Sequence, residues 1–258
     1  QKIFPIIATT SISAHKLGEP GTYFDMVIMD EASQGNIAMS LVPIIRGWSL
    51  MLVGDPQQLS PVILLHPADN ERLKKIYSVT EEYDYIKNSI YKTYLACDAV
   101  SEEILLSHHY RCNEKIIAFN NQKYYNNKLV INSQSQADTP LIFKNIAGNT
   151  TNYKNTAPRE AEEIIEFIKD NPDKSIGVIT PFTNQKELIH AMLQENGMKD
   201  VPCGTVHAFQ GDEKDVVLFS LALTEQTGQG TYDWLKNNKE LINVATSRAK
   251  EQLVIPFL

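Results

Sequence analysis

Two adjacent carboxylates follow an apolar segment near the start of the chain. Residues 26–29 are uniformly apolar and lead directly into Asp30 and Glu31. In phosphoryl-transfer sites an aspartate at the end of a strand holds Mg²⁺, usually through water, because this ion prefers hard oxygen ligands. The neighbouring carboxylate can orient or deprotonate an attacking water. The alternative is that the two acids only begin the next helix, whose dipole favours negative charge.

Two further segments carry side chains suited to phosphate. The turn at 54–61 contains Gln58, which both donates and accepts hydrogen bonds and could sense a terminal phosphate. In the segment 107–112, Arg111 offers a planar guanidinium that suits phosphate oxygens, and Tyr110 offers a face on which a base can stack. The alternative for the first segment is an ordinary Gly-Asp-Pro turn.

A metal site is another interpretation of the second segment, because it contains His108, His109 and Cys112. Adjacent residues on a strand point to opposite faces, so the two histidines are badly placed to share one ion. We therefore reject a zinc site at these residues.

Two more candidate segments lie in the last quarter of the chain. Residues 205–215 form a long polar connection between two expected strands. Residues 243–250 place Arg248 and Lys250 within one expected helix. Taken alone, the first segment also fits a charged surface loop, and the second fits a solvated helix face.

Short apolar runs alternate with helical patterns along the chain, which favours parallel sheets covered on both faces. In the first hundred residues three such runs end at polar or turn residues. Ligands bind beyond the carboxyl ends of strands in open sheets of this class, so we expect the chemistry there. Residues 61–98 indicate loop and helix without clear strands. The three expected strands are residues 3–8, 26–29 and 50–53.

A second alternating set begins near Ser101, where we place a domain boundary. Asn113 and Thr183 are suited to cap helices, Pro158 fits a first helical turn, and Gly197 can end a helix. The expected elements are strands at 104–106, 176–179, 216–221 and 253–255, helices at 113–120, from 158, at 183–197 and at 240–249, and a largely irregular stretch at 132–157.

Composition limits the class of protein. The 258 residues are 43% hydrophobic and 21% charged, which is typical of a globular protein. Because 24 basic residues face 31 acidic ones, for a net charge of −7, a strongly basic duplex binder is excluded, although a local basic groove is not. No apolar run approaches the roughly 18 residues that cross a bilayer. Three widely spaced cysteines favour a reducing, cytoplasmic location.

The candidate segments, taken in order, resemble the superfamily 1 helicases, specifically the branch that contains the nonsense-mediated-decay RNA helicase and the replication helicase/nuclease. Each block is weak alone, but their order and combination are specific, and they run from near the start of the chain almost to its end. The blocks are Asp-Glu-Ala-Ser-Gln (30–34), Gly-Asp-Pro-Gln-Gln-Leu-Ser-Pro (54–61), His-Tyr-Arg (109–111), Val-Ile-Thr-Pro-Phe (178–182), Thr-Val-His-Ala-Phe-Gln-Gly-Asp-Glu-Lys-Asp (205–215) and Asn-Val-Ala-Thr-Ser-Arg-Ala-Lys (243–250).

The resemblance implies a role for each matching residue in hydrolysis. Asp30 corresponds to the acid that holds Mg²⁺ through water, and Glu31 to the base that activates water. Gln58 is similar to the glutamine that couples the γ-phosphate to movement. Arg111 and Arg248 resemble the two arginines that reach the γ-phosphate from the second domain, and an arginine of this kind is worth roughly 10³–10⁵ in rate.

The resemblance also implies binding residues. Tyr110 corresponds to the position that stacks on adenine, and Gly211 and Glu213 belong to the block that contacts the nucleotide, with Glu213 at the ribose. The implied contacts to nucleic acid are Thr10 and Ser11 in the first domain and Thr180, Pro181 and Thr205 in the second.

The sequence departs from the family pattern in two places. His109 stands where the family usually has glutamine. The chain also contains no Gly-Lys pair, so it lacks the G-x-x-x-x-G-K-[ST] motif whose backbone amides and lysine cradle the phosphates. We therefore expect an upstream part of the same protein, preceding Gln1, to carry that Walker A motif.

The sequence predicts an α/β fold of two RecA-like, P-loop NTPase domains with parallel sheets. Residues 1–100 form the rear part of the first motor domain, truncated at its N-terminus, and residues 101–258 form the second. The resemblance implies an ATP-dependent helicase or translocase motor that uses ATP and Mg²⁺ and moves on single-stranded DNA or RNA, without a membrane partner. The alternatives are a non-catalytic nucleic-acid or protein-binding module derived from a helicase, and a motor that does not separate strands. Alone, this chain is expected to hydrolyse ATP very slowly or not at all.

Overall fold

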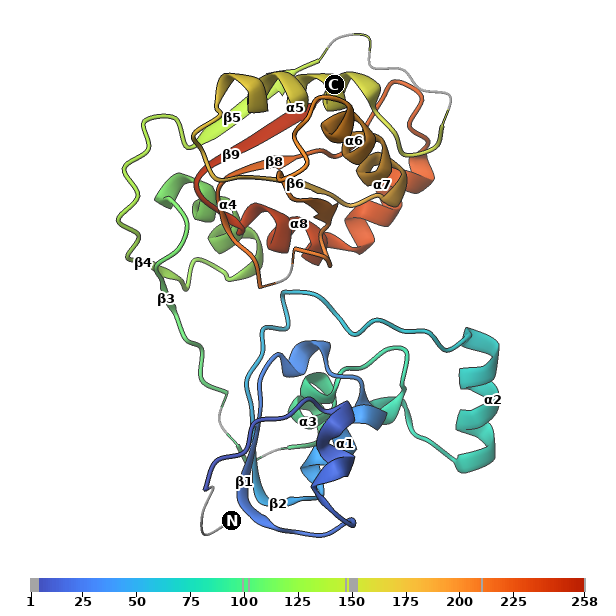
Figure 1. Ribbon diagram of the computed structural model, residues 1–258. Helices are drawn as coiled ribbons and strands as arrows, with labels where there is room; N and C mark the ends of the chain where they lie inside the picture. Colours follow the sequence, from blue (N-terminus) through green and yellow to red (C-terminus); the bar gives the residue numbers. More distant parts are fainter. Residues whose placement is uncertain are drawn as a thin grey trace. The chain divides into compact units, whose positions relative to one another are not determined.

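The chain forms two compact units, residues 1–104 and residues 105–258 (Figure 1). The computed structural model describes residues 5–98, 100–101, 103–146, 148, 153–209 and 211–257. Both units combine helices with parallel strands, which confirms the predicted α/β class. None of the helices in the described ranges is both long and apolar enough to cross a membrane.

The first unit is built on one pair of parallel strands, in which Val27 aligns with Leu50 and Met29 with Leu52. Two of the three expected strands are thereby confirmed. The expected strand at 3–8 is wrong for residues 5–8, which are exposed and irregular, and residues 1–4 lie outside the described part. The elements are η1 (Ile12–Leu17), β1 (Phe24–Met29), η2 (Ala32–Gln34), α1 (Ile37–Ile44), β2 (Gly47–Leu52), α2 (Pro67–Tyr77), η3 (Glu81–Tyr83) and α3 (Ile90–Cys97).

One face of the β1–β2 pair forms the core of the first unit. Met29 on β1 packs there with Ile37 of α1 and Ile90 of α3. The residues of the opposite face are also apolar but remain exposed, as Met26, Ile28 and Met51 show. The pair is therefore covered by helices on one side only within the described residues.

A buried ion pair stabilises the segment that contains α2 and the residues after it, up to Asp84. Lys74 Nζ lies 2.6 Å from Asp84 Oδ2 and 2.7 Å from Glu81 Oε1, and Asn70 donates to Asp84 Oδ1 at 3.1 Å. Burial by itself would raise the pKa of Asp84, but the hydrogen bonds from Lys74, the Ile86 amide and Asn70 outweigh it and lower this pKa to about 2. The fold of this segment thus depends on an ionised Asp84.

The second unit contains a five-stranded parallel sheet in the order β5-β9-β8-β6-β7. A separate two-residue parallel pair, β3 with β4, precedes it. The elements are β3 (His108–His109), α4 (Glu114–Tyr124), β4 (Val130–Ile131), β5 (Leu141–Asn145), α5 (Pro158–Asp170), β6 (Ile176–Thr180), α6 (Thr183–Glu195), β7 (Cys203–Thr205), β8 (Lys214–Phe219), α7 (Gln229–Asn237), α8 (Lys239–Thr246) and β9 (Ala249–Phe257).

Helices cover both faces of this sheet (Figure 1). On one face, Ile164 of α5 and Ile189 of α6 pack against Val178 of β6 and Leu218 of β8. On the other face, α8 contacts β8 and β9. Two covered faces explain why β6 is apolar at nearly every position, as expected for a buried parallel strand.

Several expected boundaries are confirmed in the second unit. Asn113 caps α4 by accepting the Lys115 amide at 3.0 Å, and α5 begins at Pro158. The helix α6 ends at the predicted place, because Gly197 follows it in a left-handed conformation with φ of +75°.

Three expectations about elements are wrong. Residues 104–106 are exposed and irregular, and the short strand lies at 108–109, where it pairs with β4. Thr183 does not cap α6: Phe182 occupies the cap, and its amide donates to Thr180 Oγ1 at 3.3 Å. The helix expected over 240–249 ends at Thr246, because strand pairing with β8 begins at the Arg248 carbonyl, which accepts the Lys214 amide at 3.1 Å.

Replacing Asp84 with asparagine should destabilise the protein at pH 7 by about 2 kcal/mol, the size of hydrogen bonds to a charged group. Because the pKa of Asp84 is lowered on folding, its contribution is present above its ordinary pKa near 4 and is lost as the pH falls toward 2. The gap between the thermal unfolding curves of Asp84→Asn and wild type should therefore close over that range. Asp69→Asn, at an exposed pair with Arg72 on the same helix, is the matched control and should change stability little.

Candidate nucleotide and nucleic-acid sites

The predicted acidic pair lies at the carboxyl end of β1. Asp30 follows the strand directly, and its Oδ1 accepts the Glu31 amide at 2.9 Å. Glu31 has a left-handed backbone with φ of +52°, and its Oε2 accepts from Gln34 Nε2 at 2.7 Å. Both carboxylates are exposed, so hard oxygen donors of the kind that Mg²⁺ prefers face solvent at this edge.

The ends of β1 and β2 are bound tightly to each other. Val53 donates to the Met29 carbonyl, and Ala32 donates to the Val53 carbonyl, both at 2.8 Å. A Cβ atom on Gly54 would lie 2.7 Å from the Ser33 amide, which is closer than real Cβ contacts. The loop 54–58 can therefore pass the acidic turn only because residue 54 is glycine.

The predicted Gln58 is half-buried in that second loop. Its Nε2 donates to Asp55 Oδ2 at 3.0 Å, and its amide donates to the Asp55 carbonyl at 3.0 Å. Asp55 also accepts the Gln57 amide through Oδ1 at 2.9 Å. Asp30 and Glu31 thus lie on one turn and Gln58 on the adjoining turn, at the same edge of the first unit.

The predicted nucleic-acid residues of the first unit lie at the start of η1. Thr10 is exposed, and its Oγ1 accepts the Ser13 amide at 3.2 Å. Ser11 precedes the helix as its cap residue and is half-buried. Their hydroxyls lie in a short helical turn and not at the end of a strand.

In the second unit, Arg111 is paired with Glu213. Arg111 Nε lies 2.5 Å from Glu213 Oε2, and Lys250 Nζ lies 2.9 Å from Glu213 Oε1. The hydrogen bond from Lys250, together with Arg111, lowers the pKa of Glu213 despite partial burial. One carboxylate therefore pairs with two cations, which leaves the group with a net charge of +1, and about two fifths of the Arg111 side chain remains exposed.

Arg248 lies beside the same cluster but is buried. Cys112 links the two segments: it follows Arg111, and its thiol donates to the carbonyl of Ser247, the residue before Arg248, at 3.2 Å. Burial raises the pKa of Cys112 to about 12, so the thiol stays neutral there. The Asn113 amide also donates to the Lys250 carbonyl at 2.7 Å, which fixes residues 111–113 against the start of β9.

Tyr110 is 67% exposed beside this cluster, and its ring stacks on His108 with centroids 6.1 Å apart. His109 points elsewhere and accepts the Cys112 amide through Nε2 at 2.9 Å. Burial and the nearby Arg111 lower the pKa of His109, so it is neutral at pH 7 and holds this turn as an acceptor. Gly211 is exposed on the same connection as Glu213, with φ of +79°.

The predicted nucleic-acid residues of the second unit lie at the opposite edge of its sheet. Thr180 and Thr205 end β6 and β7 and are aligned with each other, whereas Arg111, Glu213 and Arg248 lie where β8 and β9 begin. A five-residue strand separates the edges by roughly 16 Å. Thr180 is fully buried, so the accessible members of this set are Pro181 and Thr205, which are half-buried.

Phe209 fixes the connection that joins the two edges. This connection leaves β7 at Thr205 and reaches Glu213 at the start of β8. The Phe209 ring is buried against Gly177 and Gly204, where an added Cβ would lie 2.8 Å and 3.0 Å from it. The two glycines therefore provide the space that holds the connection on the sheet.

Three contributing residues were not assigned a role from the sequence. Lys250 binds Glu213, Asp55 holds Gln58, and Gln34 donates to Glu31. The two short-range partners could have been found from their spacing of three residues in polar turns. The Lys250 contact could not, because it depends on β9 beginning at Ala249, within the segment expected to be helical.

Two family models match the chain. A family model described as an AAA domain matches residues 86–256, and a second model with the same description matches residues 4–65. The two units therefore define the chain as an α/β protein with AAA domains. The chain belongs to the AAA-domain family.

Curated relatives are ATP-dependent helicases, and they confirm the resemblance to superfamily 1 helicases. The uncharacterized ATP-dependent helicase MJ0104 of Methanocaldococcus jannaschii is 29% identical over 97% of this chain and 38% of its own length. The ATP-dependent helicase NAM7 of Saccharomyces cerevisiae is 30% identical over 91% of this chain and 25% of its own. The DNA replication ATP-dependent helicase/nuclease DNA2 of Gallus gallus is 25% identical over 97% of this chain and 25% of its own length. The chain thus spans between a quarter and two fifths of these relatives.

A solved structure supports the fold. The PRRSV helicase covers 93% of this chain with a TM-score of 0.50 and 16% identity, and the match spans 35% of that protein. The likeness confirms the RecA-like architecture of parallel sheets covered by helices.

Substituting Gly54 with alanine should destabilise the first unit by about 1–3 kcal/mol, because the new Cβ forces the loop at 54–58 away from Ser33. Chemical denaturation followed by circular dichroism measures the loss. Gly21→Ala is the control, since a Cβ there meets Tyr23 at an ordinary 3.4 Å. Equal losses for the two variants would contradict the close approach of the two turns.

Proposed function

We propose that the chain is part of an ATP-dependent motor that moves on single-stranded DNA or RNA. The observation that carries the proposal is the assembly of Tyr110, Arg111, Glu213 and Arg248 at one sheet edge, in a chain whose relatives are named ATP-dependent helicases. In this proposal the units correspond to the rear part of a first motor domain and to a second motor domain.

The residues of each unit would have separate tasks. Asp30 would hold Mg²⁺ through water, and Glu31 would accept a proton from the attacking water. When bound, ATP with its Mg²⁺ supplies the phosphoanhydride whose cleavage drives the motor. Gln58 lies in the adjoining turn, where its hydrogen bonds to Asp55 can be exchanged for others. These roles fit because the two carboxylates are exposed at the end of a strand.

In the second unit, Arg111 would have to leave Glu213 to bind a phosphate. Lys250 keeps Glu213 neutralised when Arg111 departs, because it binds the other carboxylate oxygen. Tyr110 offers an exposed ring for a base beside this exchange. The cluster is therefore suited to release one guanidinium without leaving the partly buried carboxylate of Glu213 unpaired.

Glu31→Gln in the full-length protein should lower the rate of ATP hydrolysis by roughly 10²–10⁴, the usual contribution of a general base. Nucleotide binding, measured with a fluorescent ATP analogue, should persist, because the amide keeps the size of the side chain. Glu19→Gln, at another exposed carboxylate of the first unit, is the matched control. Unchanged turnover in Glu31→Gln would disprove the assigned base. The chain of 258 residues by itself is expected to hydrolyse ATP very slowly.

One face of the β1–β2 pair, which we call the bare face, exposes Met26, Ile28 and Met51. It supports a further part of the proposal, that an upstream segment of the same protein docks on the first unit. Parallel sheets of this class are covered on both faces, yet Ile28 is 62% exposed and its apolar neighbours Met26 and Met51 are also exposed. The curated relatives are far longer than this chain. In the proposal, the upstream segment carries the phosphate-binding Walker A motif.

Met51→Lys should weaken capture of the separately produced upstream segment about tenfold or more, because it places a charge in the apolar contact. A pull-down with purified segments, quantified by interferometry, measures the change. Leu41→Lys tests an exposed apolar residue of α1 instead and should leave capture unaffected. If both variants bind as wild type does, the bare face is not the docking surface.

A further inference from the structure

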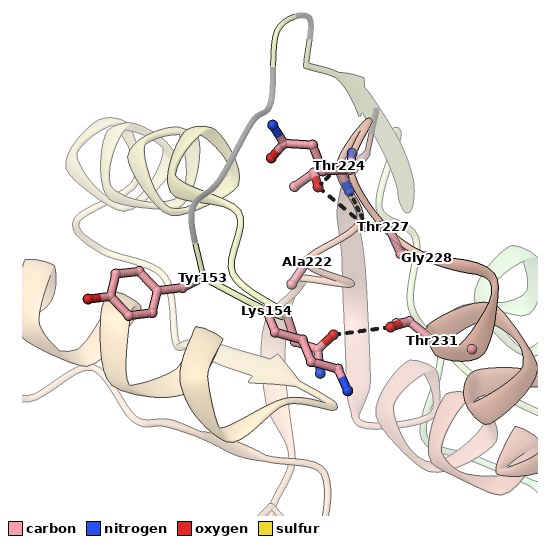
Figure 2. Close-up of a pocket in the computed structure, with 10 residues that line it drawn as sticks. Tyr153, Lys154, Ala222, Thr224, Thr227, Gly228 and Thr231 are labelled. Carbon is pink, nitrogen blue, oxygen red and sulfur yellow. Dashed lines mark hydrogen bonds between the residues drawn. The ribbon is translucent and has the colours of Figure 1, made fainter.

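A cavity of about 380 Å³ opens at the carboxyl edge of the second sheet (Figure 2). One wall is formed by residues 153–155, which precede α5, and the other by residues 222–231, which follow β8 and begin α7. The Ser220 amide donates to the Ile179 carbonyl at 2.9 Å, so this wall starts level with the end of β6. The cavity therefore lies on the same edge as Pro181 and Thr205.

The lining of the cavity is rich in hydrogen-bond donors and has one cation. Threonine hydroxyls come from positions 224, 227 and 231, and Lys154 supplies the ammonium group. None of the ten lining residues is acidic, in a chain whose net charge is −7. Glu225 belongs to the same loop but does not line the cavity. A lining with a cation, a hydroxyl donor and no carboxylate suits an anion.

The walls are held in place before any ligand binds. Ala222 and Asn155, one on each wall, have left-handed backbones with φ of +50° and +58°. The buried Glu160 fixes the first of them by accepting the Ala222 amide at 2.9 Å and the Ser220 hydroxyl at 2.6 Å. Thr231 Oγ1 bridges the walls by donating to Asn155 Oδ1 at 3.3 Å, as the dashed line in Figure 2 shows. Strained residues held in this way are typical of binding sites.

The cavity shares its support with the end of β6. Phe182, two residues after Thr180, packs with Ala222 in one buried cluster, and its ring lies 5.4 Å from that of Trp234 on α7. Tyr153 is 75% exposed at the rim, and its ring extends away from the other labelled side chains (Figure 2).

We propose that this cavity binds a backbone phosphate of single-stranded nucleic acid, with Lys154 as the cation and one hydroxyl of the Thr224–Thr227 pair as a donor, while Thr231 holds the two walls together through Asn155. The inference rests on the proposed function and extends it to residues outside the family motif blocks. It extends the nucleic-acid edge of the second unit from Pro181 and Thr205 to the start of α7.

Fluorescence anisotropy with a labelled 12-nucleotide oligothymidine, measured from 50 to 200 mM salt, tests the proposal. Loss of one phosphate contact should flatten the slope of log affinity against log salt by about 0.7 in Lys154→Gln and weaken binding roughly fivefold at 50 mM. Thr231→Val should weaken binding without changing the slope. Lys169→Gln, exposed in the last turn of α5, is the charge-matched control and should bind as wild type does.

The outcomes separate the cavity from the wider function. If Lys154→Gln binds as wild type does and shows an unchanged slope, the assignment of the cavity as a phosphate site is wrong. The proposed function is not contradicted by that result. Absence of oligonucleotide binding by the wild-type chain contradicts both. Displacement of the oligonucleotide by millimolar inorganic phosphate at constant ionic strength identifies a free-anion site, and displacement by polyglutamate identifies an acidic protein partner. Either result overturns the assignment to nucleic acid.

Discussion

The parallel pairing of β8 with β9 determines where the charged residues of the second unit lie. The pairing begins with a hydrogen bond from the Lys214 amide to the Arg248 carbonyl, and it aligns Lys214 with Ala249. This register places Glu213 beside Lys250. The Lys250 carbonyl in turn accepts a hydrogen bond from the Asn113 amide. Three segments that are more than 30 residues apart in sequence thereby meet at one edge. A slip of one residue would turn Lys250 to the other face of the sheet and remove one of the two cations from Glu213.

The sequence specifies local structure well where one residue type has a clear physical task. The asparagine before α4 and the proline at the start of α5 mark those helices correctly, and glycine in a left-handed conformation ends α6. The expectations were wrong where tertiary pairing decides the boundary. Residues 247–250 continue a helical pattern, yet the helix ends in a turn at 247–248 and pairing with β8 requires the chain to be extended from Ala249 onward. Likewise, the motif residues were identified from the sequence, whereas the contact of Arg111 with Glu213, 102 positions away, has no local signal.

The second unit separates its two sets of candidate residues by the length of its strands. The arginine cluster lies where β8 and β9 begin, and the cavity and Thr205 lie where β6, β7 and β8 end. One connection reaches both, because it starts at Thr205 and arrives at Glu213, with Phe209 packed on two glycines between them. In the proposed motor, a displacement of Glu213 would move the connection that Phe209 holds against the sheet. This packing provides a physical route between a nucleotide and a nucleic-acid strand in the proposed motor.

In the proposed motor, Arg111 would exchange its contact with Glu213 for one with a phosphate. This exchange would explain why the motor responds to a triphosphate. In the structure, Arg111 and Lys250 share the two oxygens of one carboxylate, and the pair is only partly screened by solvent. A phosphate carries more negative charge than a carboxylate and offers more acceptor oxygens, so it competes for the guanidinium effectively. In the proposed motor, the carboxylate that Arg111 leaves would keep Lys250 and would become free to accept from a ribose hydroxyl. Movement of one guanidinium would then change both ends of the bound nucleotide, and Glu213 would transmit that change to the connection that carries Thr205.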